Sequence, residues 1–279
     1  MLYLVVAVVW YIGLRCIRRR VGGVIVLCYH GIKAAQIQRF AWQVRRAAAR
    51  AVDIKALTNA DLPERVAPAI CFTFDDAFAN LGDNALPILH EHGVPACIFA
   101  VSENLGDLPR WSIAPDHPEA QELLVTAAQL QQAVHDGWCA LGSHTCTHPD
   151  LVAVPLTVAG QELRESRRVL GALAGTPVVD LALPHGSYSP GVIDAALAAG
   201  YQKIYTLEPK LHRPANDARV IGRFLMSPDA WRIEFQLTCA GAYTWLHPWR
   251  RLLSRLRRGA GDLQRSPVGA APEARETPA

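Results

Sequence analysis

Short apolar runs alternate with amphipathic stretches along most of this chain. Five runs are apolar without a strict alternation of polar positions: residues 24–29, 69–74, 96–101, 139–143 and 178–183. Such runs are typical of strands that are buried on both faces. Five other stretches have helical spacing: residues 37–49, 84–92, 127–135, 163–173 and 191–199. This alternation predicts an α/β fold with a parallel sheet, either open or closed as a barrel.

Active sites in such folds lie at the carboxyl ends of the strands, so the residues that follow each strand carry the candidate chemistry. Asp75 and Asp76 follow the second predicted strand. Two adjacent carboxylates repel each other unless a proton or a cation neutralises one of them. Taken alone, the pair is better explained as the start of a loop that caps the next helix.

His144 and His148 follow the fourth predicted strand. Imidazoles four residues apart lie on one face of a helical turn, so both can reach one ion. Two imidazoles and one carboxylate leave a coordination position open for water, as in catalytic zinc sites. The metal would lower the pKa of that water, and the second carboxylate would deprotonate it during attack on a carbonyl.

The fifth predicted strand leads into Pro184, His185 and Gly186. A turn of this composition can direct a backbone N–H toward a developing oxyanion, although such turns also occur without a chemical role. Residues 102–122 form a long loop that contains Trp111; loops of this length are usually functional or disordered, and this one could line a substrate groove. His30, which follows the first strand, is expected to be a hydrogen-bonding residue near the site rather than a fourth ligand.

Together these segments resemble the polysaccharide deacetylase family, whose members contain a NodB homology domain. The chain has TFDDA at 73–77, HTCTH at 144–148, ALPHG at 182–186 and YHGI at 29–32, where the family has TFDDG, H-S/T-x-x-H, R-x-P-Y-G and a similar early segment. The resemblance covers residues 24–223. It implies an α/β fold of the TIM-like type, a distorted (β/α)7 barrel.

The resemblance also implies hydrolysis of acetyl groups on sugars with Zn²⁺ or another divalent metal such as Co²⁺. Carried over position by position, Asp75 would be the general base and His185 would donate its backbone N–H to the oxyanion. Asp76, His144 and His148 would be the metal ligands. The expected enzyme is a carbohydrate N-deacetylase, a hydrolase of carbon–nitrogen bonds other than peptide bonds.

The chain departs from the family pattern at several positions. Ala182 stands where many members have an arginine that pairs with the base, so another group must tune Asp75 or the tuning is weaker. Arg223, in the sequence GRF, resembles an arginine position of the capsule and exopolysaccharide branches. We find no counterpart of the late Leu-x-His segment that supplies the general acid, because His212 and His247 lack that context.

These departures keep two alternative functions open. One is a catalytically silent member that binds a glycan or an assembly partner through the same groove. The other is an esterase that removes O-acetyl groups from carbohydrates. A metalloprotease is disfavoured because the chain contains no His-Glu-x-x-His.

Composition adds little to the choice of substrate but excludes some classes. An apolar content of 51% indicates a globular chain, and a net charge of +3 without a long basic run in the folded part disfavours nucleic acid as a partner. The seven cysteines are scattered without CxxC spacing, which favours buried reduced thiols and a reducing compartment.

Charge gathers at the two ends of the chain. Residues 2–14 carry no charge and are followed by Arg15 and three further arginines at 18–20, an order opposite to that of a cleaved signal peptide. We therefore predict a hydrophobic and basic segment at 1–20 that anchors to a membrane or packs on the domain. A catalytic domain at 21–244 follows, and then a basic amphipathic helix with a disordered tail at 245–279. These ends suggest a bacterial protein at the cytoplasmic face of the inner membrane that acts on a carbohydrate, such as a lipid-linked saccharide.

Overall fold

The computed structural model describes residues 2–16, 22–58, 67–111, 113, 118–213 and 218–246. In this part of the chain the strands form one eight-stranded sheet, in which neighbouring strands pair in parallel in the order β7-β6-β5-β4-β3-β2-β1-β8. The strands are β1 (Val24–Tyr29), β2 (Ala69–Asp76), β3 (Ala96–Ala100), β4 (Ala140–Ser143), β5 (Asp180–Ala182), β6 (Lys203–Thr206), β7 (Val220–Gly222) and β8 (Phe224–Leu225).

The two edge strands of this sheet belong to one stretch of chain. β7 pairs with β6, β8 pairs with β1, and only Arg223 separates β7 from β8. The amide of Arg223 donates to Thr206 of β6 at 3.0 Å, and the amide of Met226 donates to Cys28 of β1 at 2.8 Å. This stretch therefore closes the sheet into a barrel and acts as its seventh strand. The predicted (β/α)7 barrel is confirmed.

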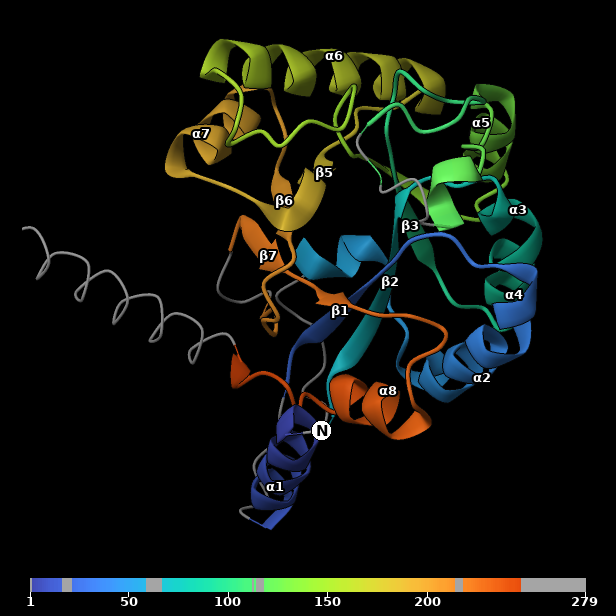
Figure 1. Cartoon of the computed structure of the whole chain (residues 1–279), viewed down its shortest axis with the longest axis vertical. Helices are drawn as coiled ribbons and strands as arrows, with labels where there is room; N and C mark the ends of the chain where they lie inside the picture. Colours follow the sequence, from blue (N-terminus) through green and yellow to red (C-terminus); the bar gives the residue numbers. More distant parts are fainter. Residues whose placement is uncertain are drawn as a thin grey trace, which may run out of the picture. The chain divides into compact units, whose positions relative to one another are not determined.

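Helices surround the barrel (Figure 1), with α6 and α7 at the top of the view and α2, α3 and α4 on the right. The α-helices are α1 (Leu2–Cys16), α2 (Ile37–Ala47), α3 (Asn80–Asn84), α4 (Leu86–Glu91), α5 (Ala127–His135), α6 (Leu156–Ala174), α7 (Pro190–Ala198) and α8 (Arg232–Cys239). Short 3-10 helices are η1 (Ala34–Gln36), η2 (Ala48–Arg50), η3 (Ile54–Thr58), η4 (Pro118–Gln121) and η5 (Pro184–Gly186).

Local sequence sets several helix ends. Thr126 caps α5, because its hydroxyl accepts a hydrogen bond from the amide of Gln129. Ser189 caps α7 in the same way, and Pro190 occupies the first helical position, where its missing N–H is not needed. α6 ends at Ala174, and Gly175 after it has a φ of 66°, the left-handed conformation that glycine tolerates best.

Some predicted boundaries were wrong. The helix predicted at 84–92 is present as α4 (Leu86–Glu91), with Pro87 in its first turn, where its missing N–H is not needed. The preceding helix, α3 (Asn80–Asn84), was not predicted. α6 begins at Leu156, seven residues before the predicted start at 163. β6, the β7–β8 stretch and α8 were not predicted.

Side-chain alternation along the strands separates the barrel interior from the surrounding layer. Val24 and Val26 of β1 belong to a cluster with Phe99, Ala182 and Tyr205, whereas the intervening residues of β1 pack in the larger cluster with the helices. Because successive strand residues face opposite sides, the smaller cluster fills the barrel. The same alternation directs every second residue of the β7–β8 stretch inward.

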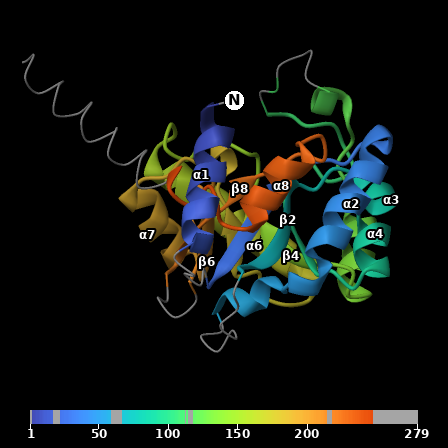
Figure 2. The same cartoon turned by 90° about the horizontal axis from the view of Figure 1, so that it is seen from below.

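The first helix packs against the last one described. Ala7 of α1 is buried against Leu237 and Ala242, which belong to α8 and to the turn after it. Figures 1 and 2 both show α1 beside α8. Within the described residues, no helix has the length and apolar character needed to cross a bilayer.

The structure tests the prediction about the cysteines but not the one about the C-terminal end of the chain. Residues 247–279, which contain most of the predicted basic helix and tail, lie outside the described residues. The six cysteines whose side chains are described are free, and five of them are buried, as predicted; they are Cys28, Cys71, Cys97, Cys139, Cys146 and Cys239.

Candidate metal centre and active site

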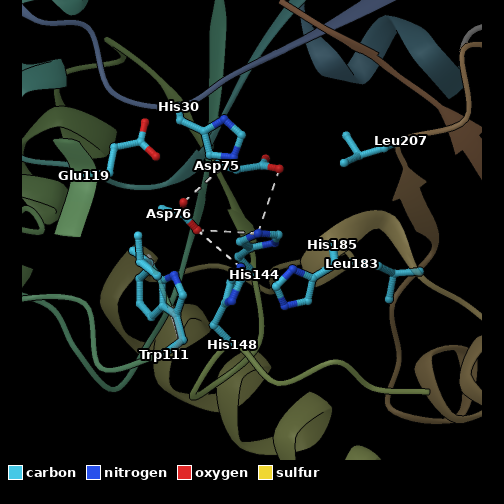
Figure 3. A pocket seen from close by; sticks show the side chains of 11 residues that line it. His30, Asp75, Asp76, Trp111, Glu119, His144, His148, Leu183, His185 and Leu207 are labelled. Carbon is cyan, nitrogen blue, oxygen red and sulfur yellow. Dashed lines mark ion pairs between the residues drawn. The ribbon is translucent and has the colours of Figure 1, made fainter. Parts of the chain in front are cut away.

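Asp76, His144 and His148 converge at the carboxyl ends of β2 and β4. The Oδ1 atom of Asp76 lies 3.6 Å from Nε2 of His144 and 3.5 Å from Nε2 of His148. One ligand atom from each residue lies within 4.8 Å of the others, and all three side chains are buried. Figure 3 shows the carboxylate of Asp76 facing both imidazoles. The three residues that the sequence suggested as ligands are therefore adjacent.

The histidines converge by a different route from the one predicted. Residues 144–148 form a loop rather than a helical turn, and Thr145 and His148 have φ values of 70° and 62°. This left-handed backbone turns both imidazoles toward Asp76. A non-glycine residue in this region costs about 1–2 kcal/mol, so other contacts must hold the loop.

Left-handed backbone is concentrated at this site. The non-glycine residues with positive φ in the described chain are Asp76 (69°), Ala77 (64°), Thr145 (70°), His148 (62°) and His185 (59°). All of them lie in the three segments that the sequence singled out. Such strain persists only where the surrounding structure enforces it, and it commonly marks functional sites.

The two histidines have the protonation state that a metal ligand needs. Burial lowers the pKa of His144 to about 4 and also lowers the pKa of His148, so both imidazoles are neutral at pH 7. Because a carbonyl can only accept, Nδ1–H of His144 donates to the carbonyl of Ala182 at 2.8 Å. This bond leaves the lone pair of Nε2 free on the side of Asp76.

The carboxylate of Asp76 fits a cation. Its Oδ1 atom is buried and has no hydrogen-bond partner among the described residues. Burial, together with the charge of Asp75, raises the pKa of Asp76 well above its usual value. A divalent cation would offset both effects, and two imidazoles with one carboxylate suit Zn²⁺ and similar metals. The residues present therefore fit the metal that the sequence suggested.

Asp75 is held by Arg223, which is completely buried. Nη1 and Nη2 of Arg223 donate to Oδ1 and Oδ2 of Asp75 at 2.6 and 2.7 Å, so the pair is bidentate. Burial alone would raise the pKa of Asp75, but the charge and hydrogen bonds of Arg223, together with the nearby imidazoles of His144 and His30, outweigh burial and hold the pKa well below its usual range. Asp75 is therefore ionised at neutral pH and can accept a proton.

This pairing resolves the departure at Ala182. Ala182 lies in the barrel interior with Phe99 and Tyr205, and the guanidinium of Arg223 lies over the Phe99 ring, 5.3 Å from its centroid. The arginine thus reaches Asp75 from the stretch that closes the barrel rather than from β5. The sequence drew attention to Arg223 but did not indicate this partner.

Cys28 is a further contact of Asp75 that the sequence did not indicate. Its thiol donates to Oδ2 of Asp75 at 3.3 Å. Burial raises the pKa of Cys28 well above its usual value, so the thiol stays neutral and keeps its proton as a donor. The only signal in the sequence is that residue 28 faces the same side of its strand as Val24 and Val26.

A pocket of about 280 Å³ opens over these groups. The loop predicted to line a groove does so, since Trp111, Ile113 and Glu119 form one wall. The Trp111 ring stacks on the imidazole of His148 at a centroid distance of 4.7 Å. His30 also lines the pocket, with Nε2 3.9 Å from Oδ2 of Asp76 (Figure 3).

His185, Leu183 and Leu207 line the same pocket. The imidazole of His185 meets that of His148 edge to face, with 4.9 Å between centroids. His212 does not reach the site, because it pairs with Val24 at the other end of β1 and Nε2–H donates to the carbonyl of Leu57 at 2.8 Å. His247 lies outside the described residues.

Comparison with known proteins identifies the family. Residues 63–204, about half of the chain, match the family described as polysaccharide deacetylase. This match runs from β2 into β6 and includes the acidic pair and the two histidines at the strand ends. The chain belongs to the polysaccharide deacetylase family.

Curated relatives are similar over part of their length. The chain is 26% identical over 189 residues to poly-beta-1,6-N-acetyl-D-glucosamine N-deacetylase of Staphylococcus epidermidis, covering 64% of this chain and 60% of that protein. It is 30% identical over 146 residues to a chitooligosaccharide deacetylase of Rhizobium leguminosarum bv. phaseoli, covering 51% of this chain and 56% of that one. The chain thus spans little more than half the length of these relatives.

Solved structures share the fold. IcaB from Ammonifex degensii superposes with a TM-score of 0.66 at 23% identity, covering 78% of this chain and 97% of that one. The Streptococcus pyogenes deacetylase PplD, in complex with acetate, gives a TM-score of 0.64 at 19% identity, covering 78% and 98%. At these identities the likeness establishes the barrel fold.

Proposed function

We propose that this chain is a metal-dependent N-deacetylase that hydrolyses the N-acetyl group of a sugar in a polysaccharide, an oligosaccharide or a lipid-linked saccharide. The proposal rests chiefly on one observation: an ionised carboxylate, Asp75, lies beside a three-residue ligand set, with Nε2 of His144 3.8 Å from its Oδ2 atom. Relatives named as N-deacetylases of acetylated glucosamine polymers and oligomers support the choice of substrate.

The roles follow from the protonation states and contacts. A divalent cation held by Asp76, His144 and His148 would polarise the acetyl carbonyl and acidify a water molecule. Asp75, kept ionised by Arg223, would take the proton of the attacking water as general base. Cys28 and Arg223 together would hold the orientation of the Asp75 carboxylate.

His185 would stabilise the oxyanion through its backbone N–H. The left-handed φ of 59° at this residue and the turn made by Pro184 and Gly186 support the assignment, because together they place His185 at the pocket wall. Proline at residue 185 would remove this donor but cannot adopt a φ of 59°, so the test instead replaces Gly186, which distorts the turn. A Cβ at Gly186 would lie 2.7 Å from Cβ of Leu207, and we expect activity to fall.

The experiment measures acetate release by the purified full chain from N-acetylglucosamine oligomers and from a lipid-linked N-acetylhexosamine, with and without Zn²⁺ or Co²⁺. Release that requires metal and is lost in Asp75→Asn and His144→Ala would support the proposal. Absence of release by a folded, metal-loaded protein would reject N-deacetylation. Release from O-acetylated sugars alone would identify an esterase, and glycan binding without hydrolysis would identify a silent member.

We also propose that the enzyme works at the cytoplasmic face of the bacterial inner membrane. One side of α1 packs on α8, while Val9, Trp10 and Ile12 remain 64%, 44% and 54% exposed. Exposed apolar and indole groups on a helix favour the interface of a bilayer. Co-sedimentation with phosphatidylglycerol vesicles tests this: binding by the full chain should fall in Val9→Ser/Trp10→Ser, and equal binding would contradict it.

A further inference from the structure

The loop that carries the two histidines has an unusual pattern of hydrogen bonds. Four consecutive backbone amides, those of residues 145–148, donate to side-chain oxygens. The amide of Thr145 donates to Oγ of Ser143 at 3.2 Å, and the amide of His148 donates to Oγ1 of Thr145 at 3.1 Å. These two contacts are local to the loop and neutral.

The remaining two amides are bound by a carboxylate from outside the loop. Oε2 of Glu162, on α6, accepts from the amides of Cys146 and Thr147 at 2.9 and 2.8 Å. Oε1 of Glu162 accepts from the hydroxyl of Thr147 at 2.8 Å. Bonds to an ionised acceptor are roughly twice as strong as neutral ones, so the three bonds to Glu162 tie the loop strongly to α6.

Glu162 lies apart from the ligand set itself. It is not among the residues whose ligand atoms converge with Asp76, and it does not line the pocket. Yet it binds two of the three residues between His144 and His148, in a loop whose left-handed backbone at Thr145 and His148 is intrinsically unfavourable. Without an external tie, the loop would relax toward ordinary backbone angles and move His148 away from Asp76.

We propose that Glu162 is a positioning residue that holds the His144–His148 loop in the geometry that binds the metal. This inference rests on the proposed function, because it concerns the same metal site. It assigns to Glu162 an effect on metal affinity rather than on the chemical step. Loss of a residue that supports metal ligands typically weakens metal affinity by about 10- to 100-fold.

The test compares Co²⁺ affinity, measured by competition with a chromophoric chelator, in the wild type and in Glu162→Ala. We expect about 10- to 100-fold weaker binding, an altered visible spectrum of bound Co²⁺, and recovery of acetate release when Co²⁺ is raised to saturation. The matched control is Glu165→Ala. It removes a carboxylate from the same helix that pairs with the exposed Arg168.

Two milder variants keep the test valid if Glu162→Ala does not fold. Glu162→Gln can still accept from both amides and can donate to Thr147, so its affinity should lie between those of the wild type and Glu162→Ala. Thr147→Val removes one of the three bonds at an exposed residue and should weaken Co²⁺ binding several-fold.

The outcomes separate this inference from the proposed function. Affinities in the Glu162 and Thr147 variants that match Glu165→Ala would overturn the positioning role while leaving the metal site intact. A folded wild-type chain that binds no Co²⁺ would overturn the metal site and this role together. Weaker binding that is accompanied by activity at saturating Co²⁺ supports both.

Discussion

Replacing Arg223 with methionine tests the electrostatic argument most directly. The variant removes a guanidinium that is completely buried, donates twice to Asp75 and once to Oγ1 of Thr73 at 3.3 Å, and lies over Phe99. Methionine retains much of the volume and the apolar contact with the ring. What is lost is the positive charge and the fork of donors.

The structure gives the expected magnitude. Asp75 would remain buried, and the Cys28 thiol would still donate to it. Removing one partner of a buried ion pair typically lowers the free energy of unfolding by about 3–5 kcal/mol. Burial would then dominate the pKa of Asp75, and a fully buried carboxyl can rise by about 3–5 units above its usual value. A base that is largely protonated at pH 7 should slow acetate release by about 100-fold or more.

The pH dependence has a defined sign. In the wild type the folded-state pKa of Asp75 is depressed, so the pair stabilises the fold above the unfolded pKa of about 3.9 and this contribution is lost only in stronger acid. In Arg223→Met the folded-state pKa is raised, so stability is lost as pH rises through it. The difference in unfolding free energy between the two proteins should therefore be smallest in acid and grow toward neutral pH.

Urea unfolding between pH 4 and pH 8 and the pH profile of kcat/KM for acetate release measure these effects. The acid limb of the profile should move up by at least about two pH units in Arg223→Met. Arg223→Lys keeps the charge without the fork and should lie between the two proteins. If Arg223→Met kept the wild-type acid limb and released acetate at a similar rate, Arg223 would not be what keeps Asp75 ionised.

Three further predictions concern the metal, the barrel packing and a buried carboxyl. Removing metal with a chelator should abolish acetate release, and Zn²⁺ or Co²⁺ should restore it without a change in the circular dichroism spectrum. Gly142→Ala should lower the free energy of unfolding by about 1–3 kcal/mol, because its Cβ would lie 2.4 Å from the Phe99 ring; Gly82→Ala, with open space around it, should not. Burial raises the pKa of Asp180 to about 6, although the Tyr205 hydroxyl donates to its carboxyl group. The protonated Asp180 side chain should therefore stabilise the fold in acid, and this contribution should be lost as pH rises through about 6. Thermal melts of Asp180→Asn, which keeps an acceptor, should lack that loss.

Apolar runs predicted the strands at 24–29 and 96–101 well, because those strands are buried on both faces and few other structures suit such runs. The strands that were missed are short. β6 has four residues and the β7–β8 stretch contains Arg223, which makes it look unlike a buried strand. A charged residue can occupy that position only because Asp75 lies opposite, and sequence spacing does not reveal that pairing.

The sequence could single out Asp76, His144 and His148 as candidate ligands because their residue types and strand-end positions restrict the choice, and the structure brings the three together. The route by which they converge was wrong, since four-residue spacing suggests a helical turn whereas the loop uses left-handed backbone at Thr145 and His148. Glu162 was missed for a related reason. It lies on a helix with ordinary amphipathic spacing, and its bonds to backbone amides leave no trace in the pattern of side chains.

Barrel geometry explains why the arginine that pairs with Asp75 is at position 223 and not at position 182. The sequence around either position does not explain it. Both positions face the barrel interior near the carboxyl ends of their strands, and both can in principle direct a long side chain toward Asp75. Phe99 and Tyr205 already occupy the interior beside Ala182, and Gly142 gives the Phe99 ring the room that it needs. The Arg223 guanidinium then uses that ring as one wall of its site. The strand that supplies the arginine is thus determined by which interior positions carry small residues. Asp75 can therefore stay ionised although residue 182 is an alanine.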